Sequence, residues 1–411
     1  MDNPRRLIVQ KFGGSSLATP QRIKEVAKRV VDEKKLGKDV IVVVSAMGDT
    51  TDELFRLAKK ISPNPPKREL DMLLTAGERI SMALLSMAIN ELGFQSISFT
   101  GSQSGIVTDT RHTRAKILDV RAYRVKDELE KGKIVIVAGF QGVSPSKEVT
   151  TLGRGGSDTT CVALAAAFRA EECEIFTDVD GVYTADPRIV PQARKIDKIS
   201  YDEMLELSFC GAQVLHSRSV DVARRFGVRV HVRSSFGKER GTMVTESDEI
   251  EATDIRGIAQ DTDVFSIALE TKEVSRIASE IMGILEENDI NLKFVSISPE
   301  SHGLEKLVIL ISRQDRELAS QVLKSQAPEL ELSFDDDVAT VSVVGHGLCT
   351  TPGITRKILE TLSSLGVEPK LVTTSGITLT LAVRRNQAEN VVRKLHEDLG
   401  LSSPTRSVEQ R

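Results

Sequence analysis

Gly153-Arg154-Gly155-Gly156-Ser157-Asp158-Thr159-Thr160 stands directly before an alanine-rich apolar run over residues 161–168. That run is typical of a buried helix. The glycine-rich segment is therefore predicted to lie at a helix N-terminus, where unpaired backbone N–H groups and the helix macrodipole favour an anion. Two interpretations stay open. The segment is either a tight turn capped by Ser157 or Asp158, or an anion site in which a buried Arg154 makes bidentate contacts.

Composition argues against several classes of protein. The chain has 411 residues, which predicts two or three domains. Its net charge of −4 comes from well-mixed charges and aromatic residues make up only 4%, so we expect no nucleic-acid partner. No apolar run approaches the ~18 residues of a membrane span, and no signal peptide opens the chain. The four cysteines form no CxxC pair and the six histidines no HExxH motif, so we expect a cytoplasmic protein without a zinc site.

Short β-branched runs alternate with helical patterns over roughly the first 230 residues. This alternation predicts an α/β fold, an open and mostly parallel sheet sandwiched by helices, with ligands bound beyond the carboxyl ends of the strands. The expected strands are residues 7–10, 40–44, 97–99, 134–137, 173–176 and 228–232. The expected helices are residues 21–35, 79–92, 121–131 and 204–207.

The composition of the sequence and the order of its predicted elements change near residue 240. We expect a catalytic domain over residues 1–240, followed by a polar and acidic linker over residues 241–260. Two similar units follow, over residues 261–335 and 336–411, and each gives the order strand, helix, two strands, helix. That order predicts a pair of ferredoxin-like α+β domains. Such a pair either senses a ligand or joins two copies of the chain, and both interpretations stay open.

Three further glycine-bearing loops follow predicted strands. They are residues 11–16 (KFGGSS), 45–51 (SAMGDTT) and 139–142 (GFQG). None is a Walker A loop or a GxGxxG fingerprint. Because the carboxyl ends of parallel strands meet at one rim of a sheet, we expect these loops and the Gly153–Thr160 segment to form a shared cleft for several oxyanions.

Polar residues near these loops each have a structural and a functional interpretation. Lys11 is either a solvated surface lysine or a phosphate clamp beside Gly13 and Gly14. Residues 178–188 (DVDGVYTADPR) form either an irregular turn or a nucleotide base-and-ribose site, and they do not fit an EF-hand loop. Glu78 opens an apolar helix, where it either complements the helix dipole or binds a substrate ammonium group.

The absence of histidine from these loops bears on the chemistry. Phosphoryl transfer depends on positioning and charge neutralisation more than on covalent catalysis. A carboxylate acceptor is already ionised at neutral pH and needs no general base. The loops therefore favour formation of an acyl phosphate over phosphorylation of a hydroxyl group.

Eight motifs occur in this order: KFGGSS, VSAMGDTTDEL, LLTAGERIS, FTGSQSG, IVAGFQGV, TTLGRGGSDTT, EIFTDVDGVYTADPR and VRSS. With them the chain resembles the aspartate kinases of the amino acid kinase superfamily, in particular the monofunctional bacterial type with two C-terminal ACT domains. The resemblance runs from about residue 5 to residue 400 and is densest before residue 235. It implies ATP-dependent phosphorylation of the β-carboxylate of L-aspartate to 4-phospho-L-aspartate, the entry step to lysine, threonine and methionine.

The resemblance also implies roles for single residues. Lys11 and Asp158 are the implied catalytic pair. Ser45, Thr51 and Arg154 are implied to bind the substrate carboxylates, and Glu78 the substrate ammonium. The implied nucleotide site comprises Lys11, Gly13, Gly14, Ser15, Thr177, Asp178, Tyr183, Asp186 and Arg188. The implied cofactors are ATP and Mg²⁺, with the cation held mainly by the ATP phosphates and by no dedicated protein site.

The chain departs from the family pattern at two places. Gln213 replaces a lysine expected near ATP, which bears on nucleotide affinity. In the ACT units the usual D-x-P-G is replaced by Thr271-Lys272-Glu273-Val274, and the strand that usually ends in Q-N reads FVSIS at residues 294–298. The usual S-E-I is replaced by Ser375-Gly376-Ile377. Sites built on hydrogen bonds discriminate strongly between ligands. We therefore expect feedback control by an amino-acid effector at the ACT domains to be weakened or altered.

Two other functions stay open. One is a catalytically weak, amino-acid-binding regulator that keeps the kinase fold, and the other is a kinase for another amino acid carboxylate, such as acetylglutamate or glutamate. Because ACT pairs generally bury their sheet edges against another copy, we expect a homodimer or a larger homo-oligomer. Met243 is a candidate internal start for a subunit that contains the ACT pair alone.

Overall fold

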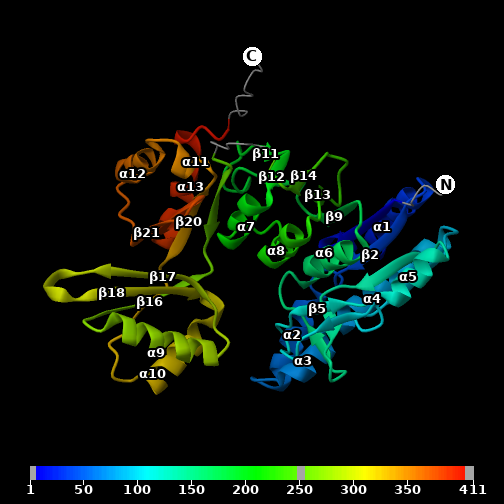
Figure 1. The fold of residues 1–411 in the computed structure, drawn as a ribbon, viewed down its shortest axis with the longest axis horizontal. Coiled ribbons are helices and arrows are strands. Elements are labelled where there is room, and N and C mark those ends of the chain that lie inside the picture. Colours follow the sequence, from blue (N-terminus) through cyan, green and yellow to red (C-terminus); the bar gives the residue numbers. More distant parts are fainter. Residues whose placement is uncertain (1–5, 248–254, 403–411) are drawn as a thin grey trace, which may run out of the picture. The chain divides into compact units, whose positions relative to one another are not determined.

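The computed structural model describes residues 6–247 and 255–402, apart from the side chains of residues 349 and 350. The chain divides into two compact units (Figure 1). The first unit comprises Met1–Val182, Lys195–Phe209 and Gln213–Ile250. The second comprises Tyr183–Arg194, Cys210–Ala212 and Glu251–Arg411. The predicted fold class, an α/β domain followed by α+β modules, is confirmed.

An eight-stranded sheet forms the centre of the first unit, with the strand order β12-β14-β13-β9-β1-β2-β6-β3. Its strands from β13 to β3 run parallel, whereas β14 runs antiparallel to β13 and parallel to β12. The strands are β1 (Leu7–Phe12), β2 (Asp39–Val44), β3 (Ser96–Phe99), β6 (Ile134–Ala138), β9 (Glu172–Thr177), β12 (Lys198–Ser200), β13 (Val230–Ser234) and β14 (Thr242–Thr245).

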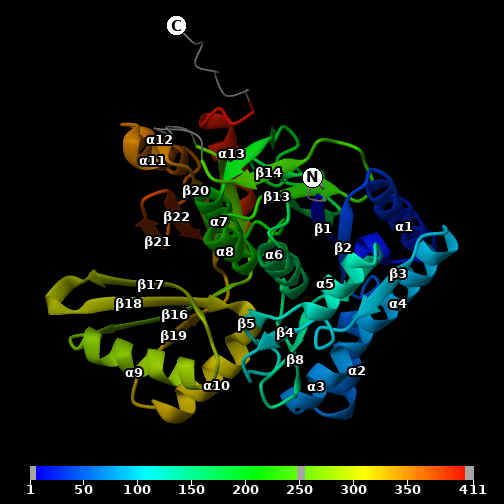
Figure 2. The ribbon, with the colours of Figure 1, turned by 45° about the vertical axis from the view of Figure 1, so that its right-hand side comes forward.

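Helices cover both faces of this sheet (Figure 2). Ile8 and Phe12 of β1 share a core with α1 (Pro20–Lys35) and α4 (Ala76–Glu91). Since side chains alternate along a strand, Val9 and Lys11 point to the opposite face, where α6 (Gly156–Phe168) packs on β1 and β9. The other helices of the unit are α2 (Thr50–Ile61), α3 (Lys67–Leu74), α5 (Tyr123–Glu130), α7 (Tyr201–Phe209) and α8 (Ser217–Phe226).

A second, four-stranded sheet in this unit, with the order β5-β4-β7-β8, escaped the sequence analysis. Its strands are β4 (Ile106–Thr108), β5 (Ile117–Val120), β7 (Gln141–Val143) and β8 (Val149–Thr151). They are only three or four residues long, too short to show an alternating pattern. A pair of two-residue strands, β10 (Val182–Tyr183) and β11 (Lys195–Ile196), was also not predicted.

One helical stretch, Lys67–Glu91, is long and apolar enough by length and composition to cross a membrane. This differs from the expectation that no apolar run approaches such a length. Core helices pass the same test, and Leu85 and Ile89 of this stretch are fully buried in the core beneath the sheet.

The second unit contains two four-stranded antiparallel sheets. One has the order β17-β18-β16-β19 and is packed by α9 and α10, and the other has the order β15-β20-β22-β21 and is packed by α12 and α13. The strands are β15 (Gly257–Asp261), β16 (Val264–Thr271), β17 (Leu292–Pro299), β18 (Glu305–Ser312), β19 (Ser333–Asp335), β20 (Ala339–Val344), β21 (Leu371–Thr374) and β22 (Thr378–Val383). The helices are α9 (Val274–Glu287), α10 (Arg316–Gln326), α11 (Gly347–Thr350), α12 (Ile354–Ser364) and α13 (Ala388–Asp398).

The expected linker over residues 241–260 is wrong at both of its ends. β14 belongs to the large sheet of the first unit, and β15 pairs antiparallel with β20 of the last module. Residues 248–254, in the middle of this range, lie outside the described residues. Because β15 precedes β16, the first α+β module is inserted between one edge strand and the remainder of the second module.

Candidate active site

Lys11 and Asp158 meet at the rim of the large sheet. Lys11 is the penultimate residue of β1, and Asp158 lies in the first turn of α6. The Lys11 Nζ atom lies 2.7 Å from the Asp158 Oδ1 atom, and the two side chains are only 13% and 12% exposed. An ion pair this well shielded from solvent holds the ammonium group in a fixed position.

The Gly153–Thr160 segment begins the helix through its backbone. Gly155 is the N-cap residue of α6, it is left-handed with φ at +67°, and no side chain caps the helix. Capping by Ser157 or Asp158, one of the two sequence interpretations, is therefore wrong. Arg154 is exposed, so the expectation of a buried arginine is also wrong. In this conformation the guanidinium group is accessible to a ligand.

The glycine loops pack against one another in two pairs, and a cleft shared by all four loops stays a prediction. A Cβ atom on Gly14 would lie 2.7 Å from the Gly48 carbonyl oxygen, and the Gly48 N–H donates to the Gly14 carbonyl at 3.0 Å. A Cβ atom on Gly139 would lie 2.8 Å from the Ser157 hydroxyl. These contacts leave no room for larger residues. Ser15 follows Gly14 and opens a short 3₁₀ helix, Ser15–Leu17.

Glu78 is buried in the first turn of α4, with 3% of its surface exposed. Its Oε1 atom accepts a hydrogen bond from the Ala46 N–H at 3.1 Å, while its Oε2 atom is buried and has no hydrogen-bond partner among the described residues. Burial raises the pKa of Glu78 to about 7. Ser45 follows β2 and directly precedes Ala46, and Thr51 lies in the first turn of α2.

The residues expected to bind the nucleotide fall in different units. Thr177 ends β9, and its hydroxyl donates to the Asp178 carboxylate at 3.0 Å. Tyr183, Asp186 and Arg188 belong to the second unit, where Asp186 and Arg188 form a 2.6 Å ion pair. Gln213, the departure from the family pattern, is exposed.

Two residues beside the Gly153–Thr160 segment, His216 and Arg218, were not predicted from the sequence. The His216 side chain caps α8 by accepting from the Arg218 N–H, and a Cβ atom on Gly155 would lie 2.2 Å from the His216 side chain. Burial and the nearby charge of Arg218 lower the pKa of His216 and favour its neutral ring. The motif VLHSR directly before α8 was the available signal.

Cavities among the described residues of the first unit include the following three. One of about 360 Å³ adjoins the start of α4 and is lined by Ala18, Met47, Gly48, Asp49, Thr50, Glu53, Gly77 and Ile80. Another of about 530 Å³ is lined by Ser16, Thr19, Gln21, Arg22, Glu25, Val26, Arg29, Ser235 and Phe236. Residues that line these two cavities are near neighbours, in the sequence, of the expected substrate and nucleotide residues.

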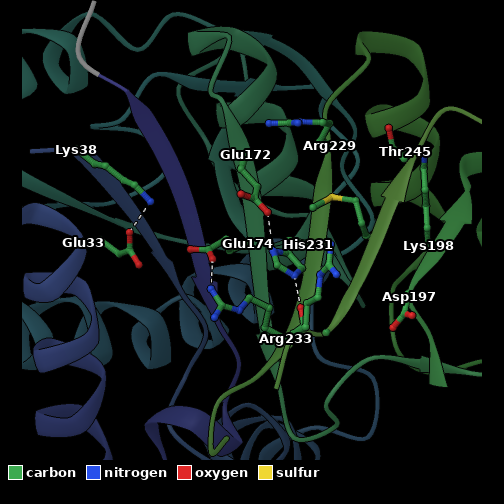
Figure 3. Close-up of a pocket in the computed structure, with 13 residues that line it drawn as sticks. Glu33, Lys38, Glu172, Glu174, Asp197, Lys198, Arg229, His231, Arg233 and Thr245 are labelled. Atoms are coloured by element: carbon green, nitrogen blue, oxygen red, sulfur yellow. Dashed lines mark hydrogen bonds and ion pairs between the residues drawn. The ribbon is translucent and has the colours of Figure 1, made fainter. Parts of the chain in front are cut away.

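The third cavity, of about 760 Å³, is lined by none of the expected site residues. Figure 3 shows its charged pairs, in which Glu172 contacts His231 at 2.6 Å and Glu174 contacts Arg233 at 2.5 Å. Because none of the expected site residues lines it, this cavity is not the candidate active site.

Comparison with known proteins agrees with this geometry. Residues 6–234 match the amino acid kinase family, and residues 341–399 match an ACT domain. The chain belongs to the amino acid kinase family. It is 47% identical to the aspartokinase of Mycolicibacterium smegmatis over 412 aligned positions, which cover 98% of each chain. Within the family, the chain is an aspartate kinase.

Solved structures of an aspartokinase are similar in fold to this chain. Aspartokinase III of E. coli in complex with aspartate and ADP, called the R-state, is 25% identical, covers 96% of this chain and all of its own, and has a TM-score of 0.83. The same enzyme in complex with lysine and aspartate, called the T-state, has a TM-score of 0.74, 25% identity and coverages of 96% and 99%.

Proposed function

We propose that the chain transfers the γ-phosphoryl group of ATP to the β-carboxylate of L-aspartate and forms 4-phospho-L-aspartate, the first step toward lysine, threonine and methionine. The shielded Lys11–Asp158 pair carries this proposal. It holds the Lys11 ammonium group beside the glycine loops, where a cation would stabilise the phosphoryl group during its transfer. Kinases for acetylglutamate or glutamate, and a non-catalytic regulator, are disfavoured by the full-length likeness to aspartokinases.

The substrate roles follow from charge. Glu78 offers a buried carboxylate with one unpaired oxygen, which suits the α-ammonium group of aspartate. Arg154 is exposed at the segment between β8 and α6 and suits a substrate carboxylate. Ser45 and Thr51 would add hydroxyl donors from the loop after β2. Asp158 would orient both Lys11 and the substrate.

The nucleotide roles remain those implied by the resemblance. Gly13, Gly14 and Ser15 would present backbone N–H groups to the ATP phosphates, and Thr177 and Asp178 would extend the site from β9. Tyr183, Asp186 and Arg188 would contact the base and ribose. Mg²⁺ would neutralise phosphate charge. Among the described residues no group of three or more His, Cys, Asp or Glu side chains is placed to hold a metal, so the cation would depend on the phosphates.

Substitution of Lys11 by methionine tests the proposal. Aspartate-dependent ADP formation should fall by about 10³-fold, because the side chain keeps most of its length and loses its charge. Lys34→Met is a matched control, since Lys34 pairs with Asp39 at 2.9 Å with similar exposure, at the other end of the sheet. If both variants keep wild-type rates, Lys11 is not catalytic.

The second unit would carry regulation and assembly. β17 is an edge strand with the apolar side chains Val295 and Ile297 exposed at 41% and 47%, which suits contact with a second copy in a homodimer or larger assembly. An amino-acid effector would bind the ACT modules, with weakened feedback. We place the enzyme in the cytoplasm. A shorter subunit starting at Met243 would still contain β15.

A further inference from the structure

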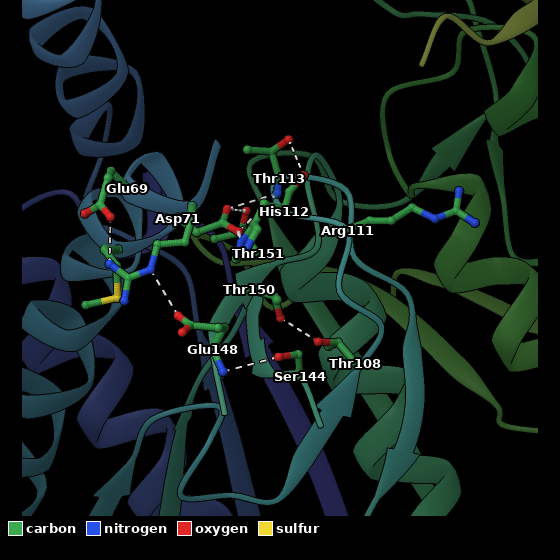
Figure 4. Close-up of polar contacts among 12 residues, drawn as sticks. Glu69, Asp71, Thr108, Arg111, His112, Thr113, Ser144, Glu148, Thr150 and Thr151 are labelled. Atoms are coloured by element: carbon green, nitrogen blue, oxygen red, sulfur yellow. Dashed lines mark hydrogen bonds and ion pairs between the residues drawn. The ribbon is translucent and has the colours of Figure 1, made fainter. Parts of the chain in front are cut away.

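Asp71 of α3 is the centre of a buried polar cluster that the proposed mechanism does not use (Figure 4). The carboxylate is 0% exposed. It accepts from the His112 Nδ1 atom at 2.7 Å, from the Thr113 N–H at 3.1 Å and from the Thr151 hydroxyl at 2.5 Å. A buried carboxylate with so many partners fixes the segments that supply them. These segments are the loop between β4 and β5 and the last residue of β8.

Thr113 is held in a strained conformation by this cluster. Its φ angle is +68°, in the left-handed region that a β-branched residue rarely adopts. Its N–H lies 3.1 Å from both oxygens of Asp71. Its carbonyl oxygen lies 2.9 Å from the place where a Cβ atom on Gly153 would stand, and Gly153 itself has φ at +77°. The strained turn therefore lies directly against the start of the Gly153–Thr160 segment.

Arg218 of α8 holds the same segment by its backbone. Its guanidinium group donates to the Leu152 carbonyl at 2.5 Å and to the Ala115 carbonyl at 2.9 Å. The Ala115 N–H in turn donates to the Thr151 carbonyl at 2.9 Å. Burial lowers the pKa of Arg218, yet an arginine keeps its charge in proteins. Two carbonyl dipoles thus stabilise a partly buried cation.

We propose that Asp71 and Arg218 are positioning residues for phosphoryl transfer to aspartate. Asp71 holds Thr151 and Arg218 holds Leu152, while Thr113, which Asp71 also holds, lies against Gly153. This inference rests on the proposed function for the roles of Arg154 and Asp158. We call Asp71, Arg218 and the backbone that they hold the clamp. The clamp sets the position of Arg154 relative to the substrate. It also sets the start of α6, and with it the position of Asp158 beside Lys11.

Thr151→Val tests the clamp, with Thr150→Val as its matched control. Both threonines are fully buried in β8, and the Thr150 hydroxyl bonds to the Thr108 hydroxyl at 2.5 Å, away from Asp71. We expect kcat/KM for aspartate to fall about tenfold in Thr151→Val and about 10²-fold in Asp71→Asn. In Thr150→Val the kcat/KM for aspartate should stay within about threefold of wild type, because the hydroxyl group that is lost does not contact Asp71. Thr151→Ser, which keeps the hydroxyl, should restore the rate, and the KM for ATP should change little throughout.

Backbone hydrogen exchange supplies a readout that does not depend on activity. Amides of residues 152–158 should exchange faster in Thr151→Val than in Thr150→Val, at a temperature where both are folded. Equal exchange, or equal loss of activity in the two valine variants, would overturn the clamp. Wild-type enzyme that fails to phosphorylate aspartate would instead overturn the proposed function, and the exchange comparison would still decide the clamp.

Discussion

At the scale of single residues, the titration of Glu78 links the fold to activity. Its pKa of about 7 lies above the ordinary value of 4.5, because burial disfavours the charged form. The folded protein therefore holds a proton that the unfolded chain releases, and stability falls as pH rises from 4.5 to about 7. Binding of a substrate ammonium group requires the opposite, ionised form. Folding thus favours the protonated form of Glu78, whereas substrate binding requires its ionised form.

We predict that kcat/KM for aspartate rises as pH increases through about 7, following ionisation of Glu78 in the free enzyme. In Glu78→Gln the rise should disappear and kcat/KM should fall by about 10²-fold, because a neutral amide cannot pair with the ammonium group. The pH dependence of unfolding over the same window should also flatten. A wild-type profile that is level from pH 6 to pH 8 would contradict this role.

Single residues also show what the sequence could and could not predict. The nearness of Lys11 and Asp158 was predictable, because each lies at the end of a recognisable element on the same rim of the sheet. The exposure of Arg154 was not, because Gly155 begins α6 through its backbone conformation and leaves the arginine outside the helix. The partners of Asp71 lie about 40 and 80 residues away in short strands and loops, without periodicity.

At the scale of secondary structure, the amino-terminal ends of β9 and β13, two neighbouring strands inside the large sheet, carry a pH-sensitive pair. Burial lowers the pKa of His231, but hydrogen bonds to Glu172 and to the Arg240 carbonyl outweigh it, and the net shift is upward. The hydrogen bond from His231 lowers the pKa of Glu172. The stabilisation from Glu172 is lost as pH falls below its ordinary value, and that from His231 is lost as pH rises through its raised pKa.

His231→Gln should therefore lower Tm most near pH 6, by about 2–4 °C, and much less at pH 9. Glu172→Gln removes the same pair and should show the same pH window. Thermal unfolding followed by circular dichroism measures both. A loss of stability that does not change with pH would show that the pair contributes only through packing.

The elements also explain why the linker prediction failed. Residues 242–245 and 257–261 are short strands whose partners lie far away in the sequence, in β13 and β20. Neither strand has a pattern that indicates its partner. By contrast, the longer strands and helices of the α+β modules were predictable from their alternation and helical periodicity.

At the scale of the whole molecule, the inserted α+β module and its altered loops suggest a distinct regulation. The loop between β16 and α9 reads Thr271-Lys272-Glu273, and the turn between β21 and β22 reads Ser375-Gly376-Ile377. We predict that lysine and threonine, alone or together at sub-millimolar concentrations, inhibit less than about twofold, well short of the roughly 5–150-fold effects typical of allosteric ligands. Cooperative inhibition by either amino acid in initial-rate assays would contradict this.

The most direct test of aspartate kinase activity is acyl phosphate formation with different acceptors. Purified wild-type protein is supplied with Mg·ATP, hydroxylamine and either L-aspartate, L-glutamate or N-acetyl-L-glutamate, and the hydroxamate is measured by its colour with ferric ion. Hydroxylamine traps an acyl phosphate and leaves a phosphorylated hydroxyl group unchanged. We predict rapid hydroxamate formation with L-aspartate and little with the other two acceptors. Preference for glutamate or N-acetylglutamate, or no hydroxamate with any acceptor, would contradict the proposed function.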